Sequence, residues 1–254
     1  CPVGQIISEY GSHFLGLLSD LRTDARMTLT ADADGWFGSA SGLLPDMNAS
    51  LEIPDSHISY VNLVEDGEFD LTLDARTTSG KLLADLKDLC FAIKGVDLNA
   101  KGTADDLLGG DPLFDVSATA CTQFADLVKY LPPESGIQAE GDVDVELDGS
   151  FKLSELTLRK INQTHLKGHI FSDGLRFSIP SDTLYAYASH PDIRINTTGS
   201  SAGAGATVDS IRFIAGAATY IMGKALKLNA MSKGHRQPAT ADVAFESLNL
   251  RGAD

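Results

Sequence analysis

Acidic side chains occupy every second position of segment 141–149, as Asp142, Asp144, Glu146 and Asp148. Four carboxylates could ligate calcium or supply the acid and base of a glycosidase. Calcium loops, however, wrap their oxygen ligands around the ion through a turn, whereas strict alternation with valine and leucine predicts a straight strand. We therefore interpret these carboxylates as the solvated outer face of a strand whose other face is apolar.

Two histidines, His165 and His169, have the four-residue spacing that places metal ligands on one face of a helix. The residues between them alternate between polar and apolar, which indicates a strand instead. Zinc would need further ligands, and none is suitably spaced, so the sequence predicts no metal site.

Three cysteines, Cys1, Cys90 and Cys121, form no metal or redox motif. For Cys90 and Cys121 the favoured interpretation is that of small buried hydrophobes, and a disulfide between them is the alternative.

Motifs of nucleophilic, nucleotide-dependent or zinc-dependent catalysis are missing from the sequence. We therefore expect no enzymatic activity and no cofactor. Aromatic side chains could still stack on sugars in a carbohydrate-binding module, although ordinary packing is the favoured interpretation. These aromatic residues are Trp36, Tyr60, Tyr185, Tyr187 and Tyr220.

The chain of 254 residues carries a formal net charge of -15 and 43% hydrophobic residues. Such a charge argues against a nucleic-acid partner, because binding a duplex requires neutralising its phosphates. The composition supplies a core, but no apolar run reaches the ~18 residues of a membrane span. Since the chain begins at Cys1, we interpret it as a fragment of a longer protein whose signal or anchor lies upstream.

Strand-like alternation dominates from Arg22 onward, with turn signals such as Asp66-Gly67 and Lys94-Gly95 between the strands. Helical spacing is limited to residues 5–21 and 122–131. The predicted strands are 51–53, 57–64, 69–75, 82–93, 96–104, 113–120, 141–147, 153–161, 166–171, 175–179, 184–188, 193–197, 211–214, 219–230 and 239–245.

This order predicts a mainly β fold, a long twisted antiparallel meander curled into a trough or a partly closed barrel. Pairing into a sandwich remains an alternative. We expect residues 1–254 to form one β-rich module. The glycine- and alanine-rich segment 200–206 favours a flexible loop, with a narrow strand as the alternative, and the module could subdivide near 199–206.

A family resemblance is carried by the segments Leu43-Leu-Pro-Asp-Met-Asn-Ala-Ser-Leu-Glu-Ile-Pro54, Leu71-Thr-Leu-Asp74, Gly95–Gly102, Asp111-Pro-Leu-Phe-Asp-Val-Ser117, Phe124-Ala-Asp-Leu-Val-Lys-Tyr-Leu-Pro132, Gly141-Asp-Val-Asp-Val145 and Leu166-Lys-Gly-His-Ile170. In these segments the chain resembles the AsmA-like proteins, particularly those of the Bacteroidetes.

The resemblance implies a periplasmic protein that is anchored in the inner membrane through a segment outside this sequence and serves outer-membrane lipid homeostasis. Relatives of this kind resemble bridge-like lipid-transfer proteins, in which an apolar groove in a long curled sheet carries phospholipid acyl chains. No catalytic residue is implied.

If the resemblance holds, strand parity selects the groove-lining side chains, for which a sealed core position is the alternative. The candidates are Leu71, Leu73, Val96, Leu98, Val116, Val143, Val145, Leu147, Phe177, Ile179, Ile193, Ile195, Ile211 and Phe213. Two other functions stay open, namely an extracytoplasmic structural or adhesive β module without a ligand and a carbohydrate-binding module.

Overall fold

The computed structural model describes residues 21–35, 45–60, 67–78, 80–157, 159–216, 219–233 and 239–252. The chain divides into two compact units, residues 1–118 and 119–254. The segment 199–206, where the sequence suggests a subdivision, lies inside the second unit.

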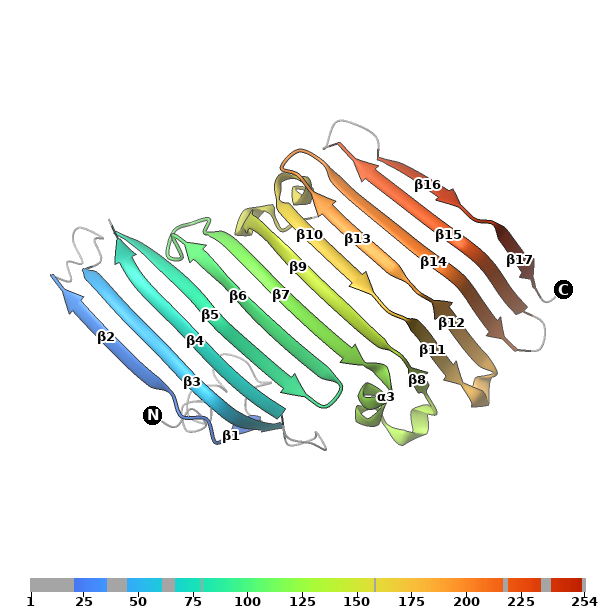
Figure 1. The fold of residues 1–254 in the computed structure, drawn as a ribbon, viewed down its shortest axis with the longest axis horizontal. Helices are drawn as coiled ribbons and strands as arrows, with labels where there is room; N and C mark the ends of the chain where they lie inside the picture. Colours follow the sequence, from blue (N-terminus) through green and yellow to red (C-terminus); the bar gives the residue numbers. More distant parts are fainter. Residues whose placement is uncertain are drawn as a thin grey trace. The chain divides into compact units, whose positions relative to one another are not determined.

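The predicted fold class is confirmed, because the described residues form antiparallel strands with very few helical turns (Figure 1). The strands that begin in the first unit are β1 (Leu21–Thr23), β2 (Thr28–Asp34), β3 (Asp46–Tyr60), β4 (Gly67–Thr78), β5 (Lys81–Ile93), β6 (Val96–Asp105) and β7 (Leu113–Gln123), the last of which contains the unit boundary.

The second unit holds β8 (Gln138–Glu140), β9 (Asp142–Lys152), β10 (His165–Phe171), β11 (Gly174–Ile179), β12 (Leu184–Ser189), β13 (Asp192–Thr197), β14 (Ala202–Ala215), β15 (Thr219–Ser232), β16 (Thr240–Ala244) and β17 (Ser247–Arg251). Its helical turns are α3 (Phe124–Leu127), η3 (Val128–Tyr130), η4 (Pro133–Ser135), η5 (Leu153–Glu155), η6 (Ile161–Gln163) and η7 (Pro180–Asp182).

The first unit is a meander in which β2, β3, β4, β5 and β6 pair in sequence order. Among the described pairings β2 hydrogen-bonds to β3 alone, and all of its residues are exposed. Within the described residues, β2 is therefore an edge strand of this unit's sheet.

In the second unit, pairs of short strands lie end to end, and we call each such pair, with the interruption near its middle, a strand line. β8 and β9 form one line, β10 and β11 the next, β13 and β12 the third, and all pair antiparallel. The long strands β14 and β15 follow, and β16 and β17 together pair with β15.

In the first unit, single extra residues interrupt the register at β3 and at β5. Pro54 and Asp55 lie where β3 shifts against β4. Lys87 lies where β5 shifts against both β4 and β6. Leu82, Ala84 and Leu86 stand at even numbers, and Leu89, Phe91 and Ile93 stand at odd numbers. The bulge therefore keeps these six residues on one face, whereas Leu83 pairs with Arg76 on the other.

In the second unit, the interruptions fall opposite one another across consecutive strand lines. They lie between Phe171 and Gly174, between Ser189 and Asp192, and at Asp209, with Ala225 opposite Asp209. A last interruption separates β16 from β17. On each of these lines the apolar positions change parity at this point, so one face stays apolar on both sides of the break.

Backbone geometry at this line of breaks departs from the extended form. His190 and Ala225 have φ of 45° and 51°, in the left-handed region. Hydrogen bonds from Ser172 N–H to the Pro191 carbonyl (3.1 Å) and from His190 N–H to the Asp173 carbonyl (3.3 Å) reconnect the interrupted ladder.

The helix predicted at 122–131 is shorter than expected, and the one predicted at 5–21 lies outside the described residues. Thr122 and Gln123 still belong to β7, and one turn of α-helix, α3, passes into the 3₁₀ turn η3. Leu131 is extended because a residue before proline is driven out of the helical region.

Two further predictions on single segments were wrong. Within 153–161, Leu153–Glu155 form the 3₁₀ turn η5, Ile161 begins η6, and none of the described residues belongs to a strand. The Glu155 carboxylate accepts the Lys152 N–H (2.9 Å) and closes a local turn. Residues 202–206 belong to β14 rather than to a loop, because the neighbouring strands β13 and β15 both pair with them.

The strand break expected at Pro54 is also absent. β3 runs from Asp46 to Tyr60 because its proline sits at a bulge, where no ladder hydrogen bond from its nitrogen is needed.

Candidate functional site

The first unit presents one sheet face without charged side chains. Along the paired positions of β2 to β6, apolar residues face apolar residues, as in the cross-strand row of Leu29, Leu51, Leu73 and Leu86. A second row joins Phe69, Phe91 and Leu98. The polar residues registered on this face are serine and threonine, namely Ser56 and Thr77.

The second unit also has an uncharged apolar face, and its cross-strand rows extend over more strands. One row crosses six strands as Val145, Ile170, Ile193, Ala206, Leu228 and Val243. Beyond the line of breaks another row contains Ala139, Phe177, Ala186, Phe213, Ile221 and Leu250. The registered positions of this face carry no charge on either side of the breaks.

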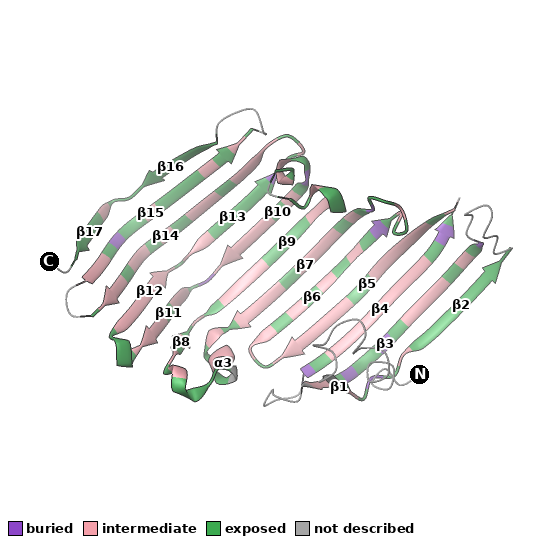
Figure 2. Cartoon of the chain, turned by 180° about the vertical axis from the view of Figure 1, so that it is seen from behind, coloured by how far each residue is buried: buried purple, intermediate pink, exposed green. Residues whose placement is uncertain are grey.

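Neither apolar face is sealed by the part of the chain that the structure describes. Within those residues the only buried hydrophobic side chains are Ala25, Ile53 and Ala104, and most positions of the sheets are half-buried (Figure 2). Leu29 is 61% exposed and Val243 is 65% exposed. Apolar surface of this extent normally marks a site that something else covers.

All fourteen predicted lining residues lie on these two apolar faces, and none of them is buried. Leu71, Leu73, Val96, Leu98 and Val116 belong to the first unit. Val116 lies against Gly102 of β6, where an added Cβ would come within 3.2 Å of Val116 Cγ1. The other nine belong to the second unit, where Leu147, Ile193 and Ile195 are exposed and the rest are half-buried.

Polar groups on the apolar faces are satisfied internally. Thr77 Oγ1 hydrogen-bonds to the Pro45 carbonyl, and Ser56 Oγ to the Pro54 carbonyl. Thr197 Oγ1 lies 2.7 Å from Thr164 Oγ1 and accepts the Leu166 N–H. In the described residues no buried side-chain nitrogen or oxygen lacks a partner, so these faces offer an incoming molecule apolar contact rather than hydrogen bonds.

Helix α3 lies beside the end of β8 at the margin of the second unit (Figure 1). The Phe124 N–H donates to the Gly141 carbonyl at 3.0 Å. Leu131, which the predicted helix would have turned inward, is 42% exposed. The helix therefore caps one end of the sheet rather than crossing its apolar face.

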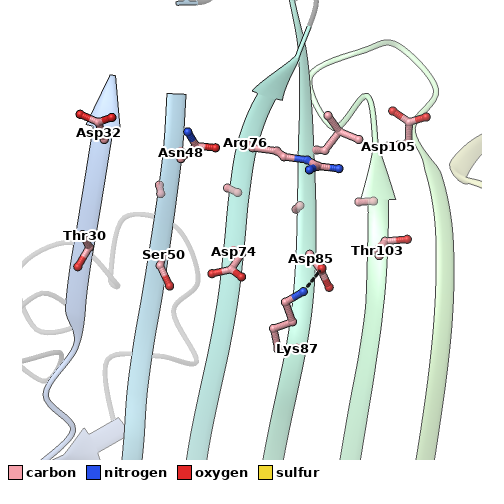
Figure 3. Close-up of a pocket in the computed structure, with 15 residues that line it drawn as sticks. Thr30, Asp32, Asn48, Ser50, Asp74, Arg76, Asp85, Lys87, Thr103 and Asp105 are labelled. Carbon is pink, nitrogen blue, oxygen red and sulfur yellow. Dashed lines mark hydrogen bonds and ion pairs between the residues drawn. The ribbon is translucent and has the colours of Figure 1, made fainter. Parts of the chain in front are cut away.

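The opposite faces of the two sheets carry the charge. In the first unit a hollow of about 540 Å³ crosses β2 to β6 on this polar face (Figure 3). Its lining includes Asp32, Asp74, Asp85 and Asp105 against the two cations Arg76 and Lys87, with an ion pair between Lys87 and Asp85. Four carboxylates against two cations make the lining of this hollow acidic.

On the polar face of the first unit, Asp70 of β4 and Cys90 of β5 occupy paired positions. Partial burial, together with the nearby carboxylates of Asp88 and Asp55, raises the pKa of Asp70. Burial and the Asp70 carboxylate likewise raise the pKa of the Cys90 thiol. Cys90 is therefore a protonated thiol at neutral pH rather than an activated nucleophile.

Neither Cys90 nor Cys121 forms a disulfide, and both are half-buried. The disulfide alternative is therefore not realised, and Cys1 lies outside the described residues.

On the polar face of the second unit, His169, Asp192 and Arg194 form a small charged cluster. Asp192 accepts hydrogen bonds from Arg194 (3.0 Å from Nε) and contacts His169 Nε2 at 3.1 Å. The hydrogen bonds from Arg194, and then from His169, lower the pKa of Asp192. His169 also stacks on Phe171, with ring centroids 4.5 Å apart.

The acidic residues that the sequence singled out lie on this polar face. Asp144, Glu146 and Asp148 pair across strands with Phe171, His169 and Lys167. They stand in a row along β9, and the described residues contain no group of three or more potential ligands that could hold a metal ion.

Strict alternation in the sequence does not assign several residues of the apolar faces to the correct face. Leu86, Leu89 and Phe91 share one face only because the bulge at Lys87 resets the parity. The sequence does carry a signal for such a site, since the apolar positions switch from even to odd numbers within one strand.

Scans against protein-family models, curated proteins and solved structures found no match to this chain. Across its described residues, no helix combines the length and apolarity that crossing a membrane would require. Physical features of the two sheets are therefore the basis for a functional proposal.

Proposed function

We propose that this chain is a lipid-binding β module whose uncharged sheet faces hold phospholipid acyl chains. The observation that carries the proposal is an apolar face, uncharged across all its registered positions and left uncovered by the described chain, in each unit. Water is displaced when an acyl chain covers such a face, and a fully buried leucine contributes roughly 1.5–3 kcal/mol.

Acyl chains suit these faces better than peptides or sugars do. A peptide or sugar brings polar groups that lose free energy when they are buried without a hydrogen-bond partner. The buried polar side chains of the apolar faces, Ser56, Thr77 and Thr197, already bond within the protein. A hydrocarbon chain brings no such requirement.

The resemblance to AsmA-like proteins adds the setting of the proposal. In that setting this chain is a section of a periplasmic protein that binds or conducts lipid and serves outer-membrane lipid homeostasis, with its anchor in a segment outside this sequence. Acyl chains lie along the apolar face, and headgroups stay in water. Transfer then needs passive sliding and no catalytic group.

Lipid capture by the purified chain tests the proposal. Native mass spectrometry and organic extraction should detect phospholipid bound to the wild-type protein. Val145→Asp places a charge on the apolar face of β9, and we expect it to remove most of the bound lipid while the protein stays folded. Ser150→Asp adds the same charge to the opposite face of the same strand and should retain the lipid.

The competing function, a structural or adhesive module without a ligand, gives different results. It predicts that the wild-type protein carries no lipid. It also predicts that Val145→Asp unfolds the protein, because Val145 would then be a buried core residue. That pair of results would refute the lipid proposal.

A further inference from the structure

A second hollow, of about 350 Å³, lies on the polar face of the second unit, where β11, β12, β14, β15 and β17 run side by side. Its charged lining residues are Arg176, Arg212 and Lys224, and no carboxylate lines it. Three cations in one lining form a local concentration of positive charge in a chain whose net charge is -15.

Two of the three cations are available to a ligand. Arg176 pairs with Glu140 at 2.6 Å. Arg212 and Lys224 take part in none of the ion pairs seen in the described part of the chain, and both are exposed. Asp209, the acid closest in sequence to Arg212, is engaged with His190 Nδ1 at 3.1 Å.

The cations are arranged around an aromatic ring. Cross-strand pairing places Tyr187 between Arg176 on β11 and Arg212 on β14. Tyr185, also on β12, lines the same hollow. Tyrosine faces stack on the C–H faces of sugar and polyol rings, while arginine binds phosphate through two parallel hydrogen bonds.

The rest of the lining consists of Ile211, Met222 and Gly223 together with neutral hydrogen-bonding groups. Ser210, Ser247 and Asn249 lie on the far side of the hollow from Arg176, on β14 and β17. Hydroxyl and amide side chains both donate and accept, which suits the hydroxyl groups of a polyol.

From this combination we propose that the hollow binds a phosphate ester of a sugar or other polyol, with Arg212 and Lys224 on the phosphate and Tyr187 against the ring. The Glu140 carboxylate neutralises Arg176, so the positive charge that is free to hold a phosphate comes from Arg212 and Lys224. Carboxylates more than about 8–10 Å from these two cations are largely screened at physiological salt. The site lies on the face opposite to the acyl chains of the proposed function, so it does not depend on that function.

The test is a titration of the full chain, followed by calorimetry and by NMR shifts of backbone amides in β12 and β14. Glucose 6-phosphate, glucose and inorganic phosphate serve as probes, with vesicles of neutral or anionic phospholipid as a separate arm. We expect glucose 6-phosphate to bind saturably and more tightly than either glucose or inorganic phosphate. Binding of anionic vesicles alone, lost with the same variants, would assign the phosphate ester to a lipid headgroup.

Variants define the site. Arg212→Ala should weaken binding about tenfold or more, the usual effect of losing a hydrogen bond to a charged group. Tyr187→Ala should weaken binding of the ester but not of inorganic phosphate, and Tyr187→Phe should restore it. Arg194→Ala is the matched control, because Arg194 lies on the same face but outside this hollow and is paired with Asp192.

Two outcomes would overturn the proposal. One is the absence of saturable binding by every phosphate-bearing probe. The other is an equal loss with Arg194→Ala and Arg212→Ala, which would show general attraction to cations rather than a site. Neither result bears on lipid capture by the apolar faces, so the two proposals fail separately.

Discussion

The two units keep one sheet face apolar by different means. In the first unit β3 and β5 each carry an isolated bulge, while β4 and β6 between and beside them run without interruption. In the second unit consecutive strand lines from β10/β11 to β16/β17 break at corresponding positions. In both units the backbone irregularity falls at the point where the apolar residues of the strand change between even and odd numbers.

The comparison shows that the bulges and strand breaks keep the apolar side chains on one face of the sheet. An extra residue in one strand would turn every following side chain to the opposite face if the ladder stayed regular. A bulge absorbs that residue and increases the local twist. The uncharged face thus depends on a few backbone positions that are themselves polar or small, such as Lys87 and Ala225.

The largest effect is expected from deleting Lys87. Without this residue, Leu89, Phe91 and Ile93 either turn to the charged face or lose their register with β4 and β6. We expect the first unit to lose its folded structure, as measured by amide NMR spectra and limited proteolysis.

Lys87→Ala is the control, since it keeps the bulge and removes only the exposed ion pair with Asp85. It should melt close to the wild type. A folded deletion variant with unchanged strand registers would show that the bulge does not set the face.

The next effect compares two positions of the same apolar face. Ile53 is 7% exposed and Leu29 is 61% exposed. Truncation of a buried isoleucine typically costs about 2–4 kcal/mol, whereas a surface truncation stays within about 0.5 kcal/mol. Urea denaturation of Ile53→Ala and Leu29→Ala should reproduce this difference, and equal losses would mean that the face is covered at β2.

A smaller effect tests the line of breaks in the second unit. Ala225 has a φ of 51°, which is strained for a residue with a Cβ and natural for glycine. Ala225→Gly should therefore stabilise the unit or leave it unchanged, within about 1 kcal/mol.

Ala206→Gly, on the apolar face of the adjoining strand β14, is the matched control and should destabilise by about 0.5–1 kcal/mol. Thermal denaturation of both variants gives the comparison. Destabilisation of equal size at the two positions would argue against the left-handed conformation at Ala225.

The smallest effect concerns pH at the same line of breaks. Because hydrogen bonds from Arg194 and His169 lower the folded-state pKa of Asp192, its ionised form is favoured by folding. This contribution to stability is present above the unfolded pKa of about 3.9 and is lost as the pH falls through the lower folded value.

Asp192→Asn should therefore melt slightly below the wild type at pH 7, and the two should converge in acid below about pH 4. A double-mutant cycle with Arg194→Ala isolates the pair. A difference between wild type and variant that persists unchanged in strong acid would contradict the assigned cause.

Much of this architecture was predictable from local patterns. Alternation such as Val96, Leu98 and Ala100 against Asp97 and Asn99 predicted β6, and its face, correctly. The predictions that failed had two kinds of cause. A local turn at Glu155 and the proline after Leu131 overrode the expected strand and helix, and at 202–206 the structure depends on partners elsewhere in the chain. The alanine- and glycine-rich start of β14 has little strand preference of its own and is a strand because β13 and β15 flank it.

The candidate sites divide in the same way. The lining residues of the apolar faces followed from strand parity, including Val145 and Phe177. The basic hollow did not, because Arg176, Tyr187 and Arg212 come from three strands and meet only through cross-strand register. Such residues share no spacing in the sequence that would mark them as one site.

The sequence by itself determined that this protein is an antiparallel β chain with a charged side and an apolar side, because side-chain alternation is a property of each strand alone. The tertiary structure decided where bulges reset that alternation and which polar side chains meet across strands. It also decided that the apolar sides stay uncovered by the described chain. These features depend on register and on contacts between distant residues, which no single strand encodes.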